Sequence, residues 1–199
     1  TGVEGRASVS WGDYDGDGDL DLALAGEKED GDPVTNVYQN EGDGSFTSID
    51  AGITGVREGA IAWGDFNNDG RLDLAVAGED KNANDIAKIY KNEGDGIFTT
   101  IEAGLVGVNF AAVAWGDYNG DGNLDLALAG NGSAGSVTKI YRNDGNGNFT
   151  EIGAELSQVS RASLAWGDYN GDGNLDLAVA GEPGTFSDPV TRIHRNEGD

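Results

Sequence analysis

The feature that most constrains this chain is a stretch of sixteen residues that occurs four times. The stretch WGDYDGDGDLDLALAG begins at Trp11, and close copies begin at Trp63, Trp115 and Trp166, at intervals of 52, 52 and 51 residues. Self-similarity at a period of about fifty residues is typical of solenoids, propellers and other repeat arrays. Every copy must therefore fold into the same supersecondary unit, and a unit of this length suits a blade of four strands.

Each unit contains four short apolar segments with the character of strands. In LDLALAG, leucines at alternate positions are separated by an aspartate and small alanines, and this period of two indicates a strand packed on both sides. ASVSW precedes the acidic loop, and VTNVYQN and FTSI flank a Gly-rich turn of the hairpin kind. No segment has helical period. We therefore predict an all-β chain, a β-propeller of four-stranded antiparallel blades.

The repeat register divides the chain into four blades that together form one propeller or part of one. We expect them at residues 1–52, 53–104, 105–155 and 156–199. The last blade is expected to lack its outer strand, because the chain reaches Asp199 within the turn that elsewhere leads into FTxI. A propeller leaves no free edge only if its ring closes. Together with the absence of methionine, this predicts a processed piece or excerpt of a longer propeller, or self-association that completes a larger ring.

The loop after each tryptophan reads D-x-[D/N]-x-D-G-x-L-D and concentrates oxygen donors. Fourteen of the 36 acidic residues lie in these four loops. Side-chain oxygens at alternate positions, a backbone carbonyl at position seven and a closing aspartate can surround a cation with about six or seven oxygens, the shell that Ca²⁺ prefers. Position seven is assigned a carbonyl because it varies among Asp, Arg and Asn. The leucine at position eight is expected to turn inward and anchor the loop on its blade.

The sequence therefore predicts about one Ca²⁺ per repeat, four per chain. The candidate metal ligands are Asp13, Asp15, Asp17, Asp19, Asp21, Asp65, Asn67, Asp69, Arg71, Asp73, Asp117, Asn119, Asp121, Asn123, Asp125, Asp168, Asn170, Asp172, Asn174 and Asp176. Zinc and copper are disfavoured because no thiol or imidazole is nearby. An EF-hand is disfavoured because its loop runs twelve residues, ends in a glutamate and lies between helices. The other alternative is a metal-free Asp-Gly turn, in which the converging carboxylates would repel one another.

These loops and their flanking strands resemble the FG-GAP or VCBS repeats of integrin α-subunit propellers and their bacterial relatives. The resemblance covers essentially the whole chain. It implies that the loop joins the first two strands of a blade and binds calcium through positions one, three, five, seven and nine. In the first blade these are Asp13, Asp15, Asp17, Asp19 through its carbonyl, and Asp21. Propellers of this family usually have seven blades, sometimes six or eight, whereas this chain shows four.

The net charge of the chain and the links that differ between repeat units limit the classes of partner that it can bind. A net charge of −24 argues against nucleic acid and anionic membrane surfaces as partners, and no apolar run is long enough for a membrane span. We expect a calcium-binding scaffold for binding or adhesion, extracellular or at the cell surface, and not an enzyme. Its protein or glycan ligand is expected at the links that differ between units, which are EKEDGDP from Glu27, EDKNAND from Glu79, NGSAGS from Asn131 and EPGTFSDP from Glu182.

Two alternatives to this function stay open. The alternatives are the propeller of a carbohydrate-active enzyme such as a polysaccharide lyase, and an engineered repeat array without its own ligand.

His194 stands where the other units have tyrosine, which predicts a core or inter-blade aromatic position rather than a catalytic base. The tryptophans share one register, which favours packing between blades over stacking on glycans. Fourfold repetition argues against a glycosidase carboxylate pair, because an active site is normally single.

Overall fold

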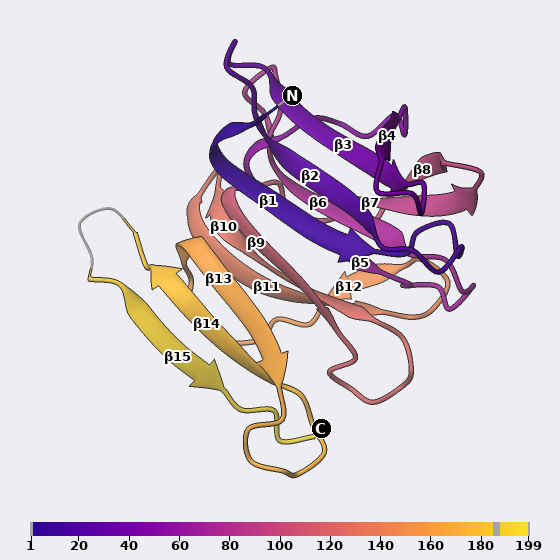
Figure 1. The fold of residues 1–199 in the computed structure, drawn as a ribbon. Coiled ribbons are helices and arrows are strands. Elements are labelled where there is room, and N and C mark those ends of the chain that lie inside the picture. The colour runs from indigo at the N-terminus through magenta and orange to yellow at the C-terminus, as the bar shows by residue number, and fades with distance from the viewer. Residues whose placement is uncertain (1, 185–187, 199) are drawn as a thin grey trace.

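The computed structural model describes residues 2–184 and 188–198, which form four antiparallel sheets (Figure 1). The first contains β1 (Glu4–Gly12), β2 (Asp21–Glu27), β3 (Pro33–Asn40) and β4 (Phe46–Ile49). The second contains β5 (Arg57–Gly64), β6 (Asp73–Glu79), β7 (Asp85–Gly94) and β8 (Ile97–Ile101). The third contains β9 (Asn109–Gly116), β10 (Asp125–Gly132), β11 (Gly135–Asn143) and β12 (Phe149–Glu151). The fourth contains β13 (Ser160–Gly167), β14 (Asp176–Glu182) and β15 (Val190–His194).

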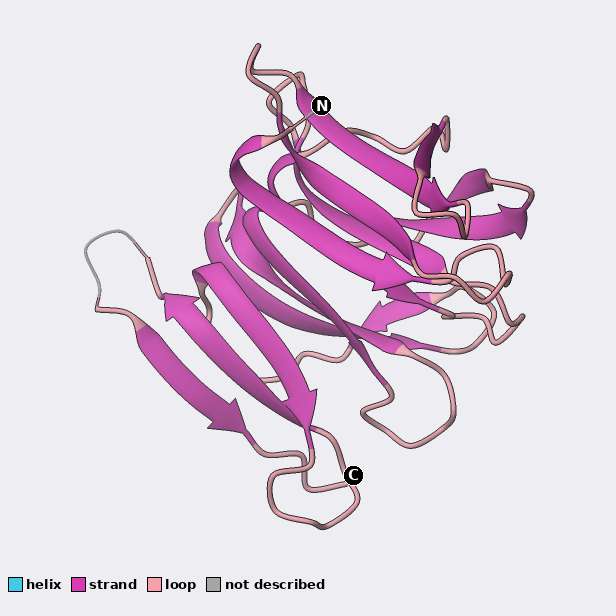
Figure 2. Ribbon diagram, viewed as in Figure 1, coloured by secondary structure: helices cyan, strands magenta, loops and turns pink. Residues whose placement is uncertain are grey.

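Each sheet is one propeller blade whose strands follow one another in chain order. The first strands of successive blades pack side by side, β5 beside β1, β9 beside β5 and β13 beside β9. No helix occurs in the described ranges, and accordingly none that could cross a membrane (Figure 2). The predicted all-β propeller is confirmed, with four-stranded antiparallel blades and three strands in the last blade.

The core lies between blades, where a face of small side chains meets a face of large ones. In the first of these contacts Ala23 and Ala25 of β2 pack against Ile61, Leu74 and Val76 of the second blade. The alanines are at most 1% exposed, and the three large side chains are at most 6% exposed. The same pairing of small and large faces recurs at the other two junctions. The alternation of Leu or Val with Ala in each second strand is therefore the sequence of a sheet that packs on both sides.

The tryptophans pack between blades, as predicted, at three of their four positions. Trp63 donates its indole N–H to the carbonyl of Ser10 in the preceding blade, with 3.2 Å between Nε1 and O. Equivalent bonds of 3.1 and 3.2 Å join Trp115 to Ala62 and Trp166 to Ala114. Each indole also stacks on an aromatic ring of the preceding acidic loop, with interplanar angles of 11°, 14° and 16°.

The leucine at loop position eight corrects one expectation. In the second blade it packs against the preceding blade, since Leu72 Cδ1 lies 2.7 Å from where a Cβ on Gly12 would be placed. In the first blade Leu20 is 56% exposed. The reason is that the loop stands at the edge of the sheet, where the neighbouring blade offers the closest apolar surface.

The meander gives every blade two different ends. The acidic loops and the turns between the third and fourth strands lie at one end, which we call the acidic end. The links between the second and third strands lie at the other, which we call the variable end. The variable link of the fourth blade includes residues 185–187, which lie outside the described residues.

Candidate metal centres in the acidic loops

The first aspartate of each loop holds the loop's own backbone. Asp13 accepts hydrogen bonds from the amides of Asp17 and Gly18, both at 3.1 Å, one on each carboxylate oxygen. The same two bonds, at 2.9–3.1 Å, are made by the first aspartates of the other loops, Asp65, Asp117 and Asp168. Gly18 has φ = 95°, and the glycines at this position in the other loops have φ of 85°, 88° and 92°. Glycine is needed here because other residues rarely adopt this left-handed conformation.

The closing aspartate of each loop is buried and ties the loop to the third strand. Asp21 accepts the amide of Tyr14 at 3.0 Å on one oxygen and the amide of Asn40 at 2.8 Å on the other. The corresponding aspartates make the same two bonds, at 2.8–3.2 Å, and they are Asp73, Asp125 and Asp176. All four are at most 2% exposed. A carboxylate can accept about four hydrogen bonds, so each retains lone pairs for a cation.

Three carboxylates converge in the first loop. One oxygen each from Asp13, Asp15 and Asp21 lies within 4.8 Å of the other two. Among the described residues this is the one group of three carboxylate, imidazole or thiol side chains arranged so closely. In the other loops an amide takes the third position, and its oxygen accepts the amide of the fifth residue at 2.8–3.0 Å. The donor atoms are oxygens throughout, and such a set fits calcium.

In the last three loops the side chain of the seventh residue contacts the side chain of the fifth residue. Asn123 and Asn174 donate their side-chain amides to the preceding aspartates at 2.9 and 3.0 Å. Arg71 forms an ion pair of 2.7 Å with Asp69. This arrangement is consistent with the predicted use of the backbone carbonyl at position seven. In the second loop it also places a guanidinium against one candidate ligand oxygen.

Burial makes the closing carboxylates of the first three loops difficult to ionise. Burial, with a smaller contribution from neighbouring carboxylates, raises the pKa of Asp73 to about 7 and that of Asp125 to about 6. Burial also raises the pKa of Asp21, although the amides of Asn40 and Tyr14 oppose the shift. Removing these groups from water penalises their charged form, and a nearby cation would favour it. The acidic end therefore carries negative charge that a bound cation would stabilise.

In the last three blades an asparagine at or near the end of the third strand links neighbouring loops, a contact that the sequence analysis did not predict. Asn92 donates its side-chain amide to the carbonyl of Tyr14 in the preceding blade at 2.8 Å and to Leu72 in its own loop at 3.1 Å. Asn143 and Asn196 reach the preceding blade in the same way, both at 2.6 Å. The available signal was the asparagine that closes YQN, YKN, YRN and HRN in the four units.

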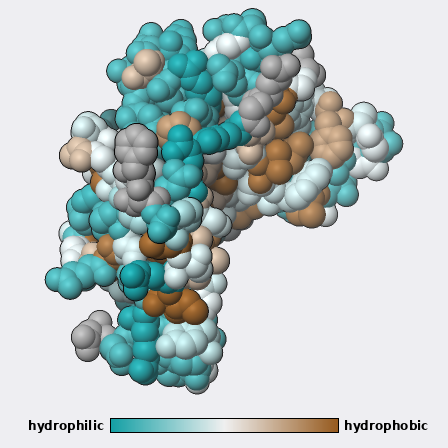
Figure 3. Space-filling view, turned by 90° about the vertical axis from the view of Figure 1, so that its left-hand side faces the viewer, coloured by the Kyte–Doolittle hydropathy of each residue, from teal (hydrophilic) through white to brown (hydrophobic). Residues whose placement is uncertain are grey.

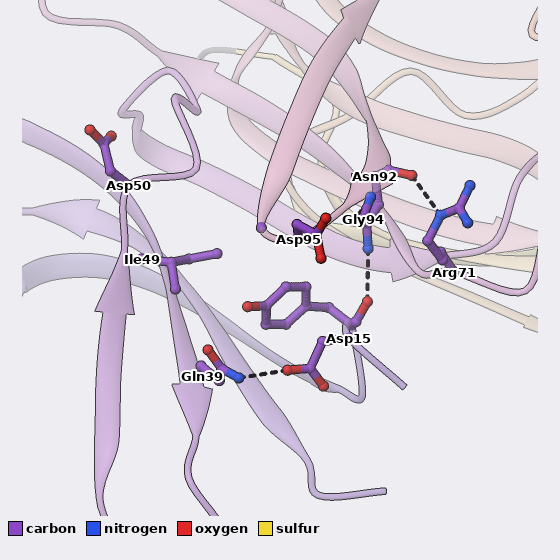
Figure 4. A pocket seen from close by; sticks show the side chains of 10 residues that line it. Asp15, Gln39, Ile49, Asp50, Arg71, Asn92, Gly94 and Asp95 are labelled. Atoms are coloured by element: carbon purple, nitrogen blue, oxygen red, sulfur yellow. Dashed lines mark hydrogen bonds between the residues drawn. The ribbon is translucent and has the colours of Figure 1, made fainter. Parts of the chain in front are cut away.

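A pocket opens beside the first loop at the acidic end. It has a volume of about 490 Å³ and lies between the first blade and the turn that joins β7 to β8. Figure 4 shows Gln39 donating to Asp15, at 2.8 Å, and Arg71 donating to the carbonyl of Asn92, at 3.0 Å. Asp15, a candidate metal ligand, therefore also borders a polar surface groove.

A second cluster lies at the variable end and was also missed from the sequence. Arg6, Glu58, Phe110 and Arg161 occupy one repeat position and line a pocket of about 320 Å³ between the four first strands. The guanidinium carbons of both arginines lie over the Phe110 ring, at 4.4 and 4.5 Å from its centroid. Glu58, Phe110 and Arg161 have φ of 47–49° at irregularities in the strand register. The signal was the change from Arg to Glu to Phe to Arg within otherwise similar units.

His194 has the structural role that its position predicts. Its Nε2 accepts the amide of Ser157 at 3.1 Å, just as the hydroxyl of Tyr141 accepts the amide of Val106 at 3.0 Å. Burial, and to a lesser extent the charge of Arg192, lowers the pKa of His194. The imidazole is therefore neutral near pH 7 and serves as an acceptor in place of the tyrosine hydroxyl.

Antiparallel blades around one axis, each with an oxygen-rich loop between its first two strands, define a repeat β-propeller. Comparison with protein families matches FG-GAP-like repeats over residues 13–76, 65–128 and 117–179. The chain belongs to the FG-GAP-like repeat family, and the resemblance inferred from the loops is confirmed. Comparison with curated proteins finds no match.

Comparison with solved structures gives two matches that cover most of this chain. One is an Agrocybe aegerita lectin described as recognising non-reducing terminal N-acetylglucosamine, with a TM-score of 0.58 and 19% identity, covering 97% of this chain and 50% of the lectin. The other is an exo-β-1,3-galactanase of Phanerochaete chrysosporium with β-1,3-galactotriose, with a TM-score of 0.47, 13% identity, and coverage of 88% and 43%. The chain thus spans half or less of each protein, and the likeness to the lectin, at 19% identity, concerns the fold alone.

Proposed function

We propose that this chain is a calcium-stabilised propeller that serves as an extracellular scaffold for binding a glycan or protein. The observation that carries the calcium part is the convergence of Asp13, Asp15 and Asp21 within 4.8 Å, together with buried closing carboxylates in all four loops. Extracellular calcium modules bind with Kd of about 10⁻⁴–10⁻³ M, and an extracellular scaffold with sites of this affinity would be calcium-loaded.

The proposed role of calcium is structural. The ions would be held by loop positions one, three, five, seven and nine of each unit, and they would supply positive charge beside the buried closing aspartates. Those aspartates begin the second strand of each blade and bind the amide at the end of the third. A filled loop would therefore hold the inner hairpin of its blade together. At tenfold excess over Kd, each site would add about 1.4 kcal/mol to the free energy of unfolding.

A calorimetric titration of the chelator-stripped chain with CaCl₂ tests this role. We expect about four ions per chain, and about three for the variant in which Asp13, Asp15 and Asp21 are all changed to Asn. MgCl₂ is the control cation, because Mg²⁺ demands a stricter octahedron and retains its waters. A folded chain that takes up no calcium would show that the loops are metal-free turns and would refute the calcium part.

The ligand is proposed to bind at the variable end. This end combines links of four different sequences with the pocket between Arg6, Phe110 and Arg161. Guanidinium groups bind carboxylates through paired, charge-assisted hydrogen bonds. Two of them beside an aromatic ring favour a carboxylate-bearing glycan as the first ligand class to test, and such a ligand would compete with Glu58 in the same pocket and with Glu182, the ion-pair partner of Arg161. Binding is proposed rather than catalysis, since the single imidazole is engaged with Ser157.

A glycan array probed with the calcium-loaded chain tests the ligand. Uronic-acid glycans are the first probes, and glycans ending in N-acetylglucosamine are included because the Agrocybe aegerita lectin recognises them. We expect binding that is lost when Arg6 and Arg161 are both changed to Ala. The charge-matched control changes Arg142 and Arg192, which are exposed on outer strands, to Ala. Equal loss in both variants, or no binding to any glycan, would contradict this assignment.

A further inference from the structure

Each of the three junctions between blades contains the same slot for a tryptophan. At the last junction the slot is made by Ala114, Gly116 and Tyr118, and Trp166 fills it. The indole N–H bonds the Ala114 carbonyl at 3.2 Å, and the ring stacks on Tyr118 at 6.4 Å between centroids. A Cβ on Gly116 would lie 2.6 Å from Trp166 Cδ1, so no side chain fits there. We call this arrangement the tryptophan slot.

The fourth blade presents an open tryptophan slot. Its members are Ala165, Gly167 and Tyr169, and with Ile193 they line a pocket of about 190 Å³. Tyr169 is 59% exposed and Ile193 is 57% exposed. A Cβ on Gly167 would meet no atom within 4 Å. A Cβ on the equivalent glycine of each other blade would overlap the indole of the next blade. At the three closed junctions the residues that correspond to Ile193 are at most 6% exposed, and they are Val37, Ile89 and Ile140.

The first blade presents the matching insert. Trp11 is 57% exposed, Val9 58% and Leu20 56%. In the second blade the equivalent residues close the junction: Trp63 enters the slot, Leu72 covers Gly12, and Ile61 is 6% exposed and donates its amide to Ser8 Oγ at 3.2 Å. The two outer faces of this chain are thus complementary halves of a contact that the chain already makes three times. Figure 3, seen from the side of the fourth blade, shows apolar patches within the hydrophilic surface.

We propose that a second copy of this chain docks its first blade on the fourth blade, with Trp11 in the open slot. The Trp11 indole donates to the Ala165 carbonyl and stacks on Tyr169, as Trp166 does with Ala114 and Tyr118. Ser163, which corresponds to Ser8, accepts the amide of Val9. The contact is heterologous, since different faces of the two copies meet, and contacts of this kind form rings when the rotation closes and extended series when it does not.

Sedimentation velocity in the presence of calcium tests the proposal on the whole 199-residue chain. We expect the mass to rise with protein concentration to two chains or more. Trp11→Ala removes the insert and Gly167→Val fills the slot, and each is expected to lower the apparent association constant at least tenfold. Ile97→Ala is the matched control, because Ile97 is an exposed apolar residue of 58% exposure on β8, outside both faces. It is expected to leave association unchanged.

Mixing the two variants separates a lost contact from a misfolded chain. Trp11→Ala keeps an open slot and Gly167→Val keeps the insert, so an equimolar mixture is expected to recover a species of two chains that neither variant forms alone. Both variants are expected to melt within a few degrees of the parent chain at a concentration where all are single chains. A mass of one chain at every concentration, or association that survives both substitutions, would overturn the proposal.

Discussion

The acidic end and the variable end of each blade belong to the same strands, yet they differ in how closely their residues and contacts repeat from blade to blade. At the acidic end, the hydrogen bonds of the first and closing aspartates recur in all four loops with lengths of 2.8–3.2 Å. At the variable end, one position holds Arg6, Glu58, Phe110 and Arg161 in turn. The comparison teaches that the fold depends on the acidic end, whereas the variable end is free to acquire specificity.

The largest expected effect comes from removing calcium, which acts on the acidic end alone. Four sites at tenfold excess over Kd contribute about 5–6 kcal/mol, which corresponds to a fall in Tm of roughly 10–20 °C for a chain of this size. Differential scanning calorimetry in CaCl₂ and in excess EGTA measures the difference. MgCl₂ in place of CaCl₂ is expected to restore little of it. An unchanged Tm would remove the energetic distinction between the two ends.

The next largest effect is expected from Asn143→Ala, which breaks the link between neighbouring loops. The substitution leaves the buried carbonyl of Phe66 and the partly buried carbonyl of Leu124 without their donor, at a cost of about 1–3 kcal/mol. Asn40→Ala is the control, because Asn40 bonds the carbonyl of Leu20 in its own loop and stands in the first blade. Its cost is expected to be smaller, and urea unfolding of both variants in CaCl₂ gives the comparison. Equal costs would show that the link between blades contributes nothing.

A third effect concerns pH in the absence of calcium. Burial raises the pKa of Asp73 to about 7 and that of Asp125 to about 6, above their value of 3.8 in an unfolded chain. The folded chain therefore binds protons more tightly, and its stability falls as pH rises from about 4 to 7. Urea unfolding of the calcium-stripped chain in calcium-free buffer at pH 5, 6 and 7 is expected to show this decline. Saturating calcium, which favours the ionised carboxylates, is expected to flatten it, and a stability that rises with pH in calcium-free buffer would contradict the assignment.

The smallest effect on stability is expected from Arg161→Ala at the variable end. The substitution removes a surface ion pair of 2.7 Å with Glu182 and a contact with the Phe110 ring, together about 1 kcal/mol or less. Its Tm in CaCl₂ is expected to lie within a few degrees of the parent chain. A loss as large as that of Asn143→Ala would show that this end also supports the fold.

The repeat in the sequence predicted the blades, the acidic loops and the tryptophan contacts, because a period of two and a fixed loop spacing are local properties. What it did not predict depends on neighbouring blades. The direction of Leu72 follows from the glycine of the preceding blade, and the raised pKa of Asp73 follows from burial between two blades. The meeting of Arg6 with Phe110 requires strand irregularities with positive φ at residues such as Glu58, which propensity does not foresee.

The asparagine contacts have one further consequence, because they join the loops into a continuous series. Asp21 binds the amide of Tyr14, whose carbonyl is held by Asn92, whose own amide binds Asp73. The same sequence of bonds continues through the third blade to the fourth. Hydrogen bonds in such series polarise one another, and repeat arrays couple nearest neighbours. Calcium binding along the acidic end is therefore expected to be cooperative. An ion bound in one loop would raise the calcium affinity of the adjacent loop, so that the four sites fill over a narrow range of calcium concentration.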